Sequence, residues 1–236
     1  MNLQLFAPCY GPPGTERIAD RLRHSAKHFS YPDVTLYMLG MLSPGSPHGG
    51  EMQGVYIIEE MKRSTAELVI CSDASDVLFT GPMDEMLEKF LAFDSPFVIG
   101  TEMSSHVRGE DIETGMTRLW KESGHRYGAL NIGYWIGYRE YAIELLQKSI
   151  DLYRGTPNQL DNPQAWLPMG LVRDTLVFTL DRNAVLFQPA EDMPNLRIEN
   201  GRLHNVVTDT WPSMIHFNGS GGNLGEYDKF YREIIR

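Results

Sequence analysis

The chain has 236 residues, a mass of 26.8 kDa and a composition that is ordinary for a globular protein, with 42% hydrophobic and 22% charged residues. This length fits one large α/β domain and can bury a sizeable core. The formal net charge of -10 argues against a broad grip on nucleic-acid phosphates. No apolar run approaches the roughly 18–20 residues needed to cross a bilayer.

The redox and targeting signals predict a cytoplasmic protein of the producing or host cell. The first residues, Met1–Pro8, lack the basic region and long apolar core of a signal peptide. Only Cys9 and Cys71 are present, each within or just after an expected strand. Two such residues are more typical of reduced thiols than of a disulfide framework.

The first hundred residues alternate between expected strands and helices. Strands are expected at 3–7, 34–38, 68–71 and 96–100, and helices after Thr15, from about Gln53 to Arg63 and after Pro82. Turn-rich loops at 8–14 and 40–50 follow the first two strands. This β-α alternation predicts an α/β fold with a nucleotide-binding half at about 1–100.

The remaining sequence, about 101–236, is richer in short strands and is expected to face an acceptor. Strands are expected at 129–137, 185–187, 203–208 and 214–216, and helices after 137, at 171–180 and at 226–236. Segment 103–128 is a loop whose length suggests a function, and 158–170 is a Pro-rich loop. No repeat or boundary divides the chain, so 1–236 is expected to be a single domain.

Two acids follow the most apolar of the expected strands. The run Leu68–Cys71 ends in Ser72-Asp-Ala-Ser-Asp76. In open α/β sheets, ligands bind beyond the carboxyl ends of the strands. Two carboxylates confined there repel each other unless a cation or a shared proton offsets the charge, and a divalent cation suits carboxylate oxygens. The alternative is ordinary turn chemistry, since Asp and Ser are common in turns.

Five stretches, in order, carry a resemblance to one family. They are Ser72-Asp-Ala-Ser-Asp76, Val98-Ile-Gly-Thr-Glu102, Leu130-Asn-Ile-Gly-Tyr-Trp-Ile-Gly137, Arg173-Asp-Thr-Leu-Val-Phe-Thr179 and Ile215-His-Phe-Asn-Gly219. Together they resemble the glycosyltransferase domain of procollagen lysyl hydroxylases and its microbial and viral relatives. The resemblance implies a GT-A fold, with a Rossmann-like mixed sheet and helices on both faces. It also implies a uridine-diphosphate (UDP) sugar as donor and Mn²⁺ as cofactor.

The resemblance implies a metal site made of three residues. Asp73 and Asp76 match the acidic pair of the family, and His216 matches the histidine of its His-x-Asn-Gly motif. An imidazole ligand favours Mn²⁺, with Mg²⁺ as the other candidate. The metal would offset the charge on the departing diphosphate. The alternative for His216 is a packed or capping histidine.

The resemblance also implies donor contacts. Asn131 matches the Leu-Asn-Ser-Gly element, where an amide can bind sugar hydroxyls, although Ile132 replaces the serine. Gly133 would allow a close backbone approach, or it would mark a bulge. The other candidates are Ala7, Pro8 and Tyr10 after the first strand, Asp73 and Ser75 in the acidic turn, and Asn218 and Gly219, whose N–H groups could wrap the diphosphate.

Two further acids are candidates for catalysis. Asp174 matches the second acid of the family's Asp-Asp-Gln element and could act as general base or orient the sugar. Arg173 and Thr175 depart from that element, and a solvated helix acid is the alternative reading of Asp174. Glu102, at the expected rim of the sheet, could bind acceptor or sugar, or it could be an exposed loop acid.

The resulting prediction is a metal-dependent transfer of glucose or galactose from a UDP-sugar to an acceptor hydroxyl. The acceptor would lie against the two long loops, where Trp120, Tyr127 and Trp166 could stack on a sugar or simply pack. A saccharide, a hydroxylated protein side chain or, less favoured by the acidic charge, a modified DNA base are open acceptors. The alternative functions are a non-catalytic nucleotide-sugar binder and a metal-dependent nucleotidyltransferase or hydrolase.

Overall fold

The structure is a computed structural model that describes residues 1–9, 15–38, 49–103, 124–154, 177–217 and 224–235. Its helices are η1 (Thr15–Ala19), α1 (Asp20–His28), α2 (Gly49–Arg63), α3 (Met83–Ala92), α5 (Arg139–Arg154), η2 (Ala190–Asn195) and α7 (Leu224–Ile234). Its strands are β1 (Leu3–Cys9), β2 (Val34–Met38), β3 (Leu68–Ser72), β4 (Val77–Phe79), β5 (Phe97–Glu102), β6 (Ala129–Tyr138), β7 (Thr179–Leu180), β8 (Phe187–Pro189), β9 (Leu196–Glu199), β10 (Arg202–Asn205) and β11 (Met214–His216).

The strands form a large mixed sheet, a small sheet and a hairpin. The large sheet has the order β2-β1-β3-β6-β5-β7, in which β6 runs antiparallel to both of its neighbours and the other pairs are parallel. The small sheet has the order β4-β11-β8, and β9 pairs with β10. The mixed α/β fold expected from the sequence is therefore confirmed.

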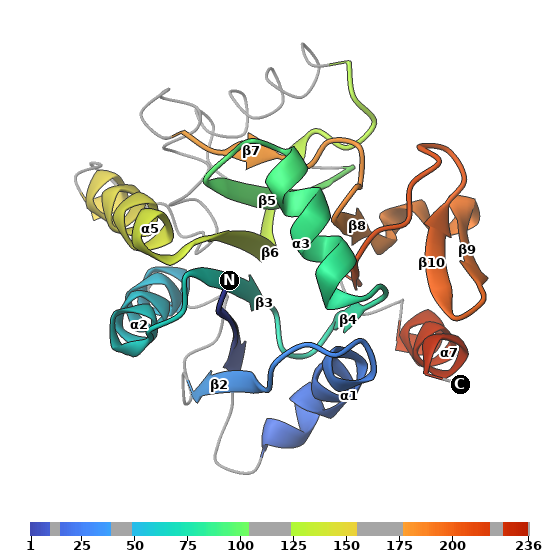
Figure 1. The fold of residues 1–236 in the computed structure, drawn as a ribbon, viewed down its shortest axis with the longest axis horizontal. Coiled ribbons are helices and arrows are strands. Elements are labelled where there is room, and N and C mark those ends of the chain that lie inside the picture. The colour runs from blue at the N-terminus through green and yellow to red at the C-terminus, as the bar shows by residue number, and fades with distance from the viewer. Residues whose placement is uncertain (10–14, 39–48, 104–123, 155–176, 218–223, 236) are drawn as a thin grey trace.

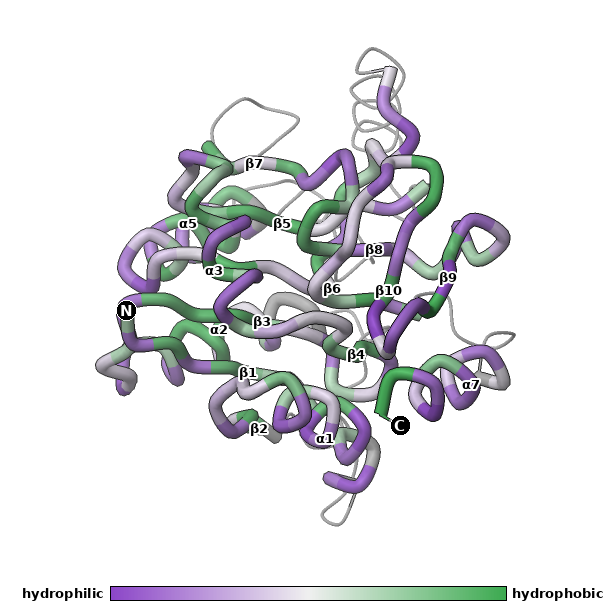
Figure 2. The backbone as a smooth tube through the Cα atoms, turned by 45° about the vertical axis from the view of Figure 1, so that its right-hand side comes forward, coloured by the Kyte–Doolittle hydropathy of each residue, from purple (hydrophilic) through white to green (hydrophobic). Residues whose placement is uncertain are grey.

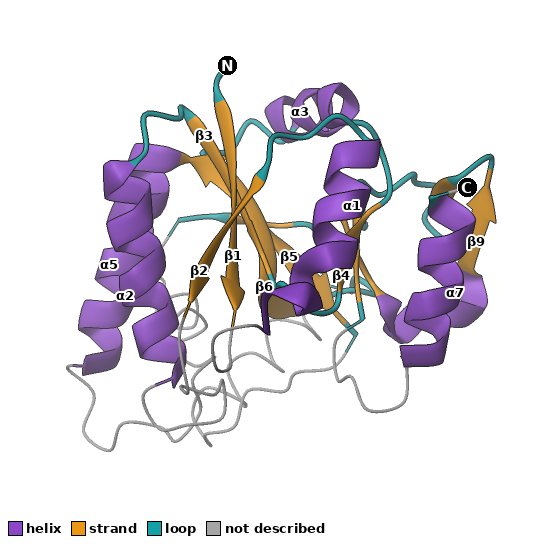
Figure 3. Cartoon of the chain, turned by 90° about the horizontal axis from the view of Figure 1, so that it is seen from below, coloured by secondary structure: helices purple, strands orange, loops and turns teal. Residues whose placement is uncertain are grey.

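Helices cover both faces of the large sheet, as Figures 1 and 3 show. On one face α2 and α5 contribute Ile57, Ile58, Met61, Leu145, Leu146 and Ile150 to a core cluster with the sheet. On the other face α1 and α3 contribute Leu22, Ala26, Met86 and Phe90. Strands covered on both faces read as continuous apolar runs, as the buried strand Leu68–Ser72 does (Figure 2).

The small sheet has its own cover. In Figure 1, α7 lies beside the β9–β10 hairpin, and its residues Tyr227, Phe230 and Ile234 pack in one cluster with Leu78 of β4 and Ile215 of β11. The chain crosses from the large sheet to the small one between β3 and β4. Since β11 is the central strand of the small sheet, this packing fixes the position of its last residue next to that crossing.

Several local expectations were wrong or incomplete. The second helix begins at Gly49 rather than near Gln53, and strands β4 and β9 were not predicted. Of the helix expected over 171–180 the structure describes only residues 177–180, and there Thr179 and Leu180 form a strand that pairs with Val98 and Ile99 of β5. Strands of two to four residues are too short to show a periodic pattern, so pairing with other strands defines them.

Both cysteines are buried and reduced, and no disulfide joins them. Burial raises the pKa of the Cys71 thiol far above its ordinary value, so this residue stays protonated and unreactive at neutral pH. Within the described residues, none of the helices combines the length and the apolar character that a membrane span requires.

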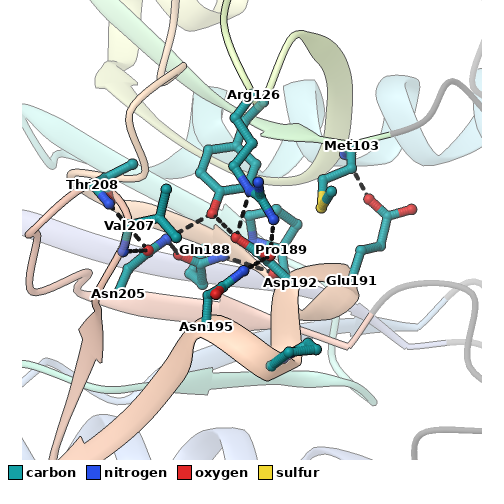
Figure 4. A network of polar contacts seen from close by, with 12 residues as sticks. Met103, Arg126, Gln188, Pro189, Glu191, Asp192, Asn195, Asn205, Val207 and Thr208 are labelled. Carbon is teal, nitrogen blue, oxygen red and sulfur yellow. Dashed lines mark hydrogen bonds and ion pairs between the residues drawn. The ribbon is translucent and has the colours of Figure 1, made fainter.

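A buried polar network joins the residues just before β6 to the region of β8, η2 and β10 (Figure 4). The carboxylate of Asp192, 2% exposed, accepts hydrogen bonds from Arg126, from the hydroxyl of Tyr127 and, at 2.7 Å, from the Asn195 amide. Asn205 donates to the Tyr127 hydroxyl at 2.7 Å. Tyr127 is fully buried, so of the two readings given for it, packing is the one that the structure shows.

The same region anchors one described residue on each side of the segment 104–123. Met103 donates its backbone N–H to Glu191 at 2.6 Å, and Arg126 forms an ion pair with Asp192, the next residue of η2 (Figure 4). Two adjacent residues of one short helix therefore hold Met103, directly after β5, and Arg126, shortly before β6.

The Asp192 network predicts a loss of stability in acid. Burial by itself raises the pKa of Asp192, but the hydrogen bonds from Arg126, Tyr127 and Asn195 and the charge of Arg126 outweigh it and hold that pKa below its ordinary value. A carboxyl with a depressed pKa stabilises the fold above its unfolded pKa of about 3.9, and the contribution disappears as pH falls through the folded pKa. We expect Asp192→Asn to lose about 1 to 3 kcal/mol near neutral pH.

Urea denaturation of the native chain and of Asp192→Asn, between about pH 7 and about pH 3, measures this contribution. The gap in unfolding free energy between the two proteins should narrow as pH falls below about 4. A gap that stays constant over this range would show that the charge of Asp192 contributes nothing.

Candidate active site

The two acids of the predicted metal site lie in the turn that connects the two sheets. Asp73 follows β3, and Asp76 precedes β4. The backbone N–H of Asp73 donates to the carbonyl of Gly133 in β6 at 2.8 Å. The carbonyl of Asp76 accepts from the N–H of Phe217, directly after β11, at the same distance. The turn is thus tied on one side to the large sheet and on the other to the small sheet.

His216 brings the third side chain to this turn. It is the last residue of β11, where it pairs with Val77 of β4 and Pro189 of β8, and it is 4% exposed. Its Nε2 atom lies 3.4 Å from Oδ2 of Asp73 and 3.5 Å from Oδ2 of Asp76. The alternative of ordinary turn acids does not account for a buried imidazole between them.

The geometry fits one divalent cation. One ligand atom from each of Asp73, Asp76 and His216 lies within 4.8 Å of the others. Adjacent ligands of an octahedral ion at about 2.1 Å from the metal lie about 3 Å apart, so small side-chain adjustments would close the site. Two carboxylates and one imidazole are a donor set that suits Mn²⁺ and leave positions open for substrate oxygens.

The charges of this cluster also favour a cation. Burial raises the pKa of the Asp73 carboxyl above its ordinary value. For His216, burial alone would lower the pKa, but the charge of Asp76, hydrogen bonds to both acids and the charge of Asp73 raise it to about 10. Without a metal, the imidazolium proton therefore offsets the two carboxylates. A divalent cation that binds here displaces that proton.

The amide of Asn131, in β6, lies against the other side of the His216 ring. Its Oδ1 atom is 3.1 Å from Nδ1 of His216 and accepts the N–H of Gly133 at 2.8 Å. Its Nδ2 donates to the carboxylate of Glu102 at 3.0 Å. Asn131 is 6% exposed and Glu102 is 3% exposed, so the reading of Glu102 as an exposed loop acid is wrong.

An irregularity in the pairing of β6 with β5 places Asn131 and Gly133 at the site. Between the pairs Ile99–Trp135 and Thr101–Leu130, the single residue Gly100 of β5 faces the segment 131–134 of β6. Bulges of this kind redirect side chains and are frequent beside active sites. Gly133 is part of this segment, and a Cβ atom on it would lie 2.3 Å from Cε1 of His216 and 2.8 Å from Oδ2 of Asp73. Only glycine fits there.

The other predicted site residues fall into two groups. Ala7 and Pro8 are buried in β1, where the methyl group of Ala7 belongs to the core, and Ser75 is exposed and donates to Oδ1 of Asp76 at 3.3 Å. Tyr10, Trp120, Trp166, Asp174, Asn218 and Gly219 lie outside the described residues. The sequence pattern did not identify the contact of Asn131 with His216, and no local signal indicates it.

The fold matches that of a known glycosyltransferase. The structure is similar to the crystal structure of a glycosyltransferase involved in the glycosylation of the major capsid of PBCV-1, with a TM-score of 0.57 and 13% identity over 98% of this chain and 99% of that chain. The family of the PLOD GT domain matches residues 15–230, so the chain belongs to this family of glycosyltransferase domains. No curated protein matches the chain. The family expected from the five stretches is confirmed.

Proposed function

We propose that this glycosyltransferase is a metal-dependent hexosyltransferase that moves glucose or galactose from a UDP-sugar to an acceptor hydroxyl. The observation that carries the proposal is the convergence of Asp73, Asp76 and His216 on one point between the two sheets. Mn²⁺ held there would offset the charge that grows on the departing UDP, so departure needs no proton from the protein.

Different residues of the chain would bind the cation, the donor and the acceptor. Asp73, Asp76 and His216 hold the cation, and Gly133 lets the backbone of β6 approach it. We place the donor at the carboxyl ends of β1 and β3, which form part of the half at about 1–100. Asp174 remains the proposed base on the acceptor hydroxyl, and the half at about 101–236 would receive the acceptor.

The first test is a calorimetric titration of the protein with UDP, with Mn²⁺ present and then with a chelator, alongside Asp76→Ala and His216→Ala. UDP binding should require Mn²⁺ and should be lost in both variants, because each removes one of three protein ligands. Transfer from UDP-glucose or UDP-galactose to water or an acceptor should fall by about 10²–10³-fold or more.

Asp33→Ala serves as the control, since Asp33 is an exposed acid before β2 and is not one of the three proposed ligands. UDP binding that persists with chelator and in both variants would overturn the metal site. Absence of UDP binding with Mn²⁺ present would overturn the donor and turn attention to other nucleotide-sugars.

A further inference from the structure

The imidazole of His216 has two nitrogen atoms, and they face opposite sides. Nε2 faces the carboxylates of Asp73 and Asp76, and Nδ1 faces the amide of Asn131 at 3.1 Å. A metal can bind only a ring nitrogen that carries no proton, so the remaining proton of the neutral ring must reside on the other nitrogen. Whatever holds a proton on Nδ1 therefore presents the Nε2 lone pair to the metal.

The contacts of Asn131 fix which of its atoms faces the ring. Oδ1 accepts the backbone N–H of Gly133 at 2.8 Å, and Nδ2 donates to Oε2 of Glu102 at 3.0 Å. A flipped amide would point its NH₂ group at the N–H of Gly133 and its oxygen at a carboxylate, losing both hydrogen bonds. The oxygen thus faces His216 and can only accept a hydrogen bond from Nδ1–H.

We infer that Glu102 and Asn131 are positioning residues that act through His216. Glu102 orients the amide of Asn131, and that amide holds the His216 ring with Nδ1–H bound and Nε2 directed at the cation site. The inference rests on the proposed metal-dependent function and goes beyond it. In this inference Glu102 and Asn131 orient the metal ligand His216. The sequence had instead suggested direct contacts of these two residues with acceptor or sugar.

Burial and fold topology support this assignment. Glu102 and Asn131 are both nearly inaccessible, and Glu102 is not among the described acids whose ligand atoms gather with those of Asp73 and Asp76. The β6 irregularity opposite Gly100 places Asn131 between the end of β5 and the end of β11. Groups that bind the second nitrogen of a metal-ligating histidine typically change metal affinity by 10–100-fold.

The test compares Glu102→Met with Glu102→Gln by titrating Mn²⁺ and following the free ion by electron paramagnetic resonance. Methionine preserves the side-chain length but cannot accept the hydrogen bond from the Asn131 amide, whereas glutamine keeps an oxygen that can accept it. We expect the Mn²⁺ affinity of Glu102→Met to be about 10–100-fold weaker and that of Glu102→Gln to stay within about threefold of native. A thermal scan of each variant separates this effect from loss of fold.

A measurement on the native protein needs no variant. With Zn²⁺ bound as a diamagnetic probe, ¹⁵N–¹H spectra should show His216 coordinated through Nε2 and protonated at Nδ1. Coordination through Nδ1, or equal Mn²⁺ affinity in native protein and Glu102→Met, would overturn the inference while leaving the metal site intact. Failure of the native protein to bind Mn²⁺ would overturn the proposed function and the inference together.

Discussion

Replacing Gly133 with alanine is expected to abolish Mn²⁺-dependent UDP binding without changing any charge of the site. The new Cβ atom would lie 2.3 Å from Cε1 of His216 and 2.8 Å from both Nδ1 of His216 and Oδ2 of Asp73. These separations are far inside van der Waals contact, so two of the three metal ligands would have to move. We expect Mn²⁺ affinity to fall by more than about 100-fold. This loss exceeds the usual effect of mutating a residue that only hydrogen-bonds to a metal ligand.

Gly225→Ala is the matched control. Gly225 lies in the first turn of α7, and a Cβ atom there would meet nothing within 4 Å. Calorimetry of both variants with Mn²⁺ and then with UDP should show native behaviour for Gly225→Ala and no metal-dependent binding for Gly133→Ala. If Gly133→Ala bound Mn²⁺ as tightly as the native protein, the close packing of β6 against the site would not matter for function.

The second large effect concerns stability. Asp181→Ala is expected to lower the free energy of unfolding by about 3 to 6 kcal/mol, because it leaves several backbone donors without an acceptor. The side chain of Asp181 is fully buried. Its Oδ1 accepts the N–H of Val185 at 2.9 Å, and its Oδ2 accepts those of Leu186 and Phe187 at 2.7 and 2.8 Å.

Asp181 also links the two sheets. Its own N–H donates to Ile99 and its carbonyl accepts from the Thr101 hydroxyl, both in β5, while its carboxylate organises the entry into β8. Because β8 pairs with β11, loss of Asp181 should also loosen the strand that carries His216.

Urea denaturation of Asp181→Ala checks this expectation, with Asp33→Ala as the control because Asp33 is an exposed aspartate before β2. The control should unfold within about 0.5 kcal/mol of native. A loss of less than about 1 kcal/mol in Asp181→Ala would mean that water or a rearranged turn satisfies the donors.

Local signals in the sequence determined most of the first half of the fold and two of the three residues of the proposed metal site. The apolar run Leu68–Cys71 followed by Asp73 and Asp76 was predicted as a buried strand ending in paired acids. The structure has the buried strand β3 at Leu68–Ser72, and both acids lie in the turn that follows it. The helix after Pro82 and the strand at Val34–Met38 were likewise found as expected. These features depend on residues close in sequence, where hydrophobic period and turn chemistry act directly.

The sequence order of the motifs also indicated that His216 belongs with the two acids, but only through resemblance to a family. The structure supplies the physical reason. Residue His216 ends β11, which pairs with β4, so it is placed beside Asp76 by strand register. Register between distant strands follows from the packing of the whole small sheet under α7 and is not written in any local pattern.

Tertiary structure alone decided the surroundings of the site. Asn131 and His216 are 85 positions apart, and Glu102 and Asn131 are 29 apart, yet they form one chain of hydrogen bonds. Their meeting depends on the antiparallel insertion of β6 between β3 and β5 and on its irregular register at Gly100. The sequence by itself determined which residues carry the charges and the imidazole. The sheet order decided which of them touch, because a side chain's partner is set by the strand beside it.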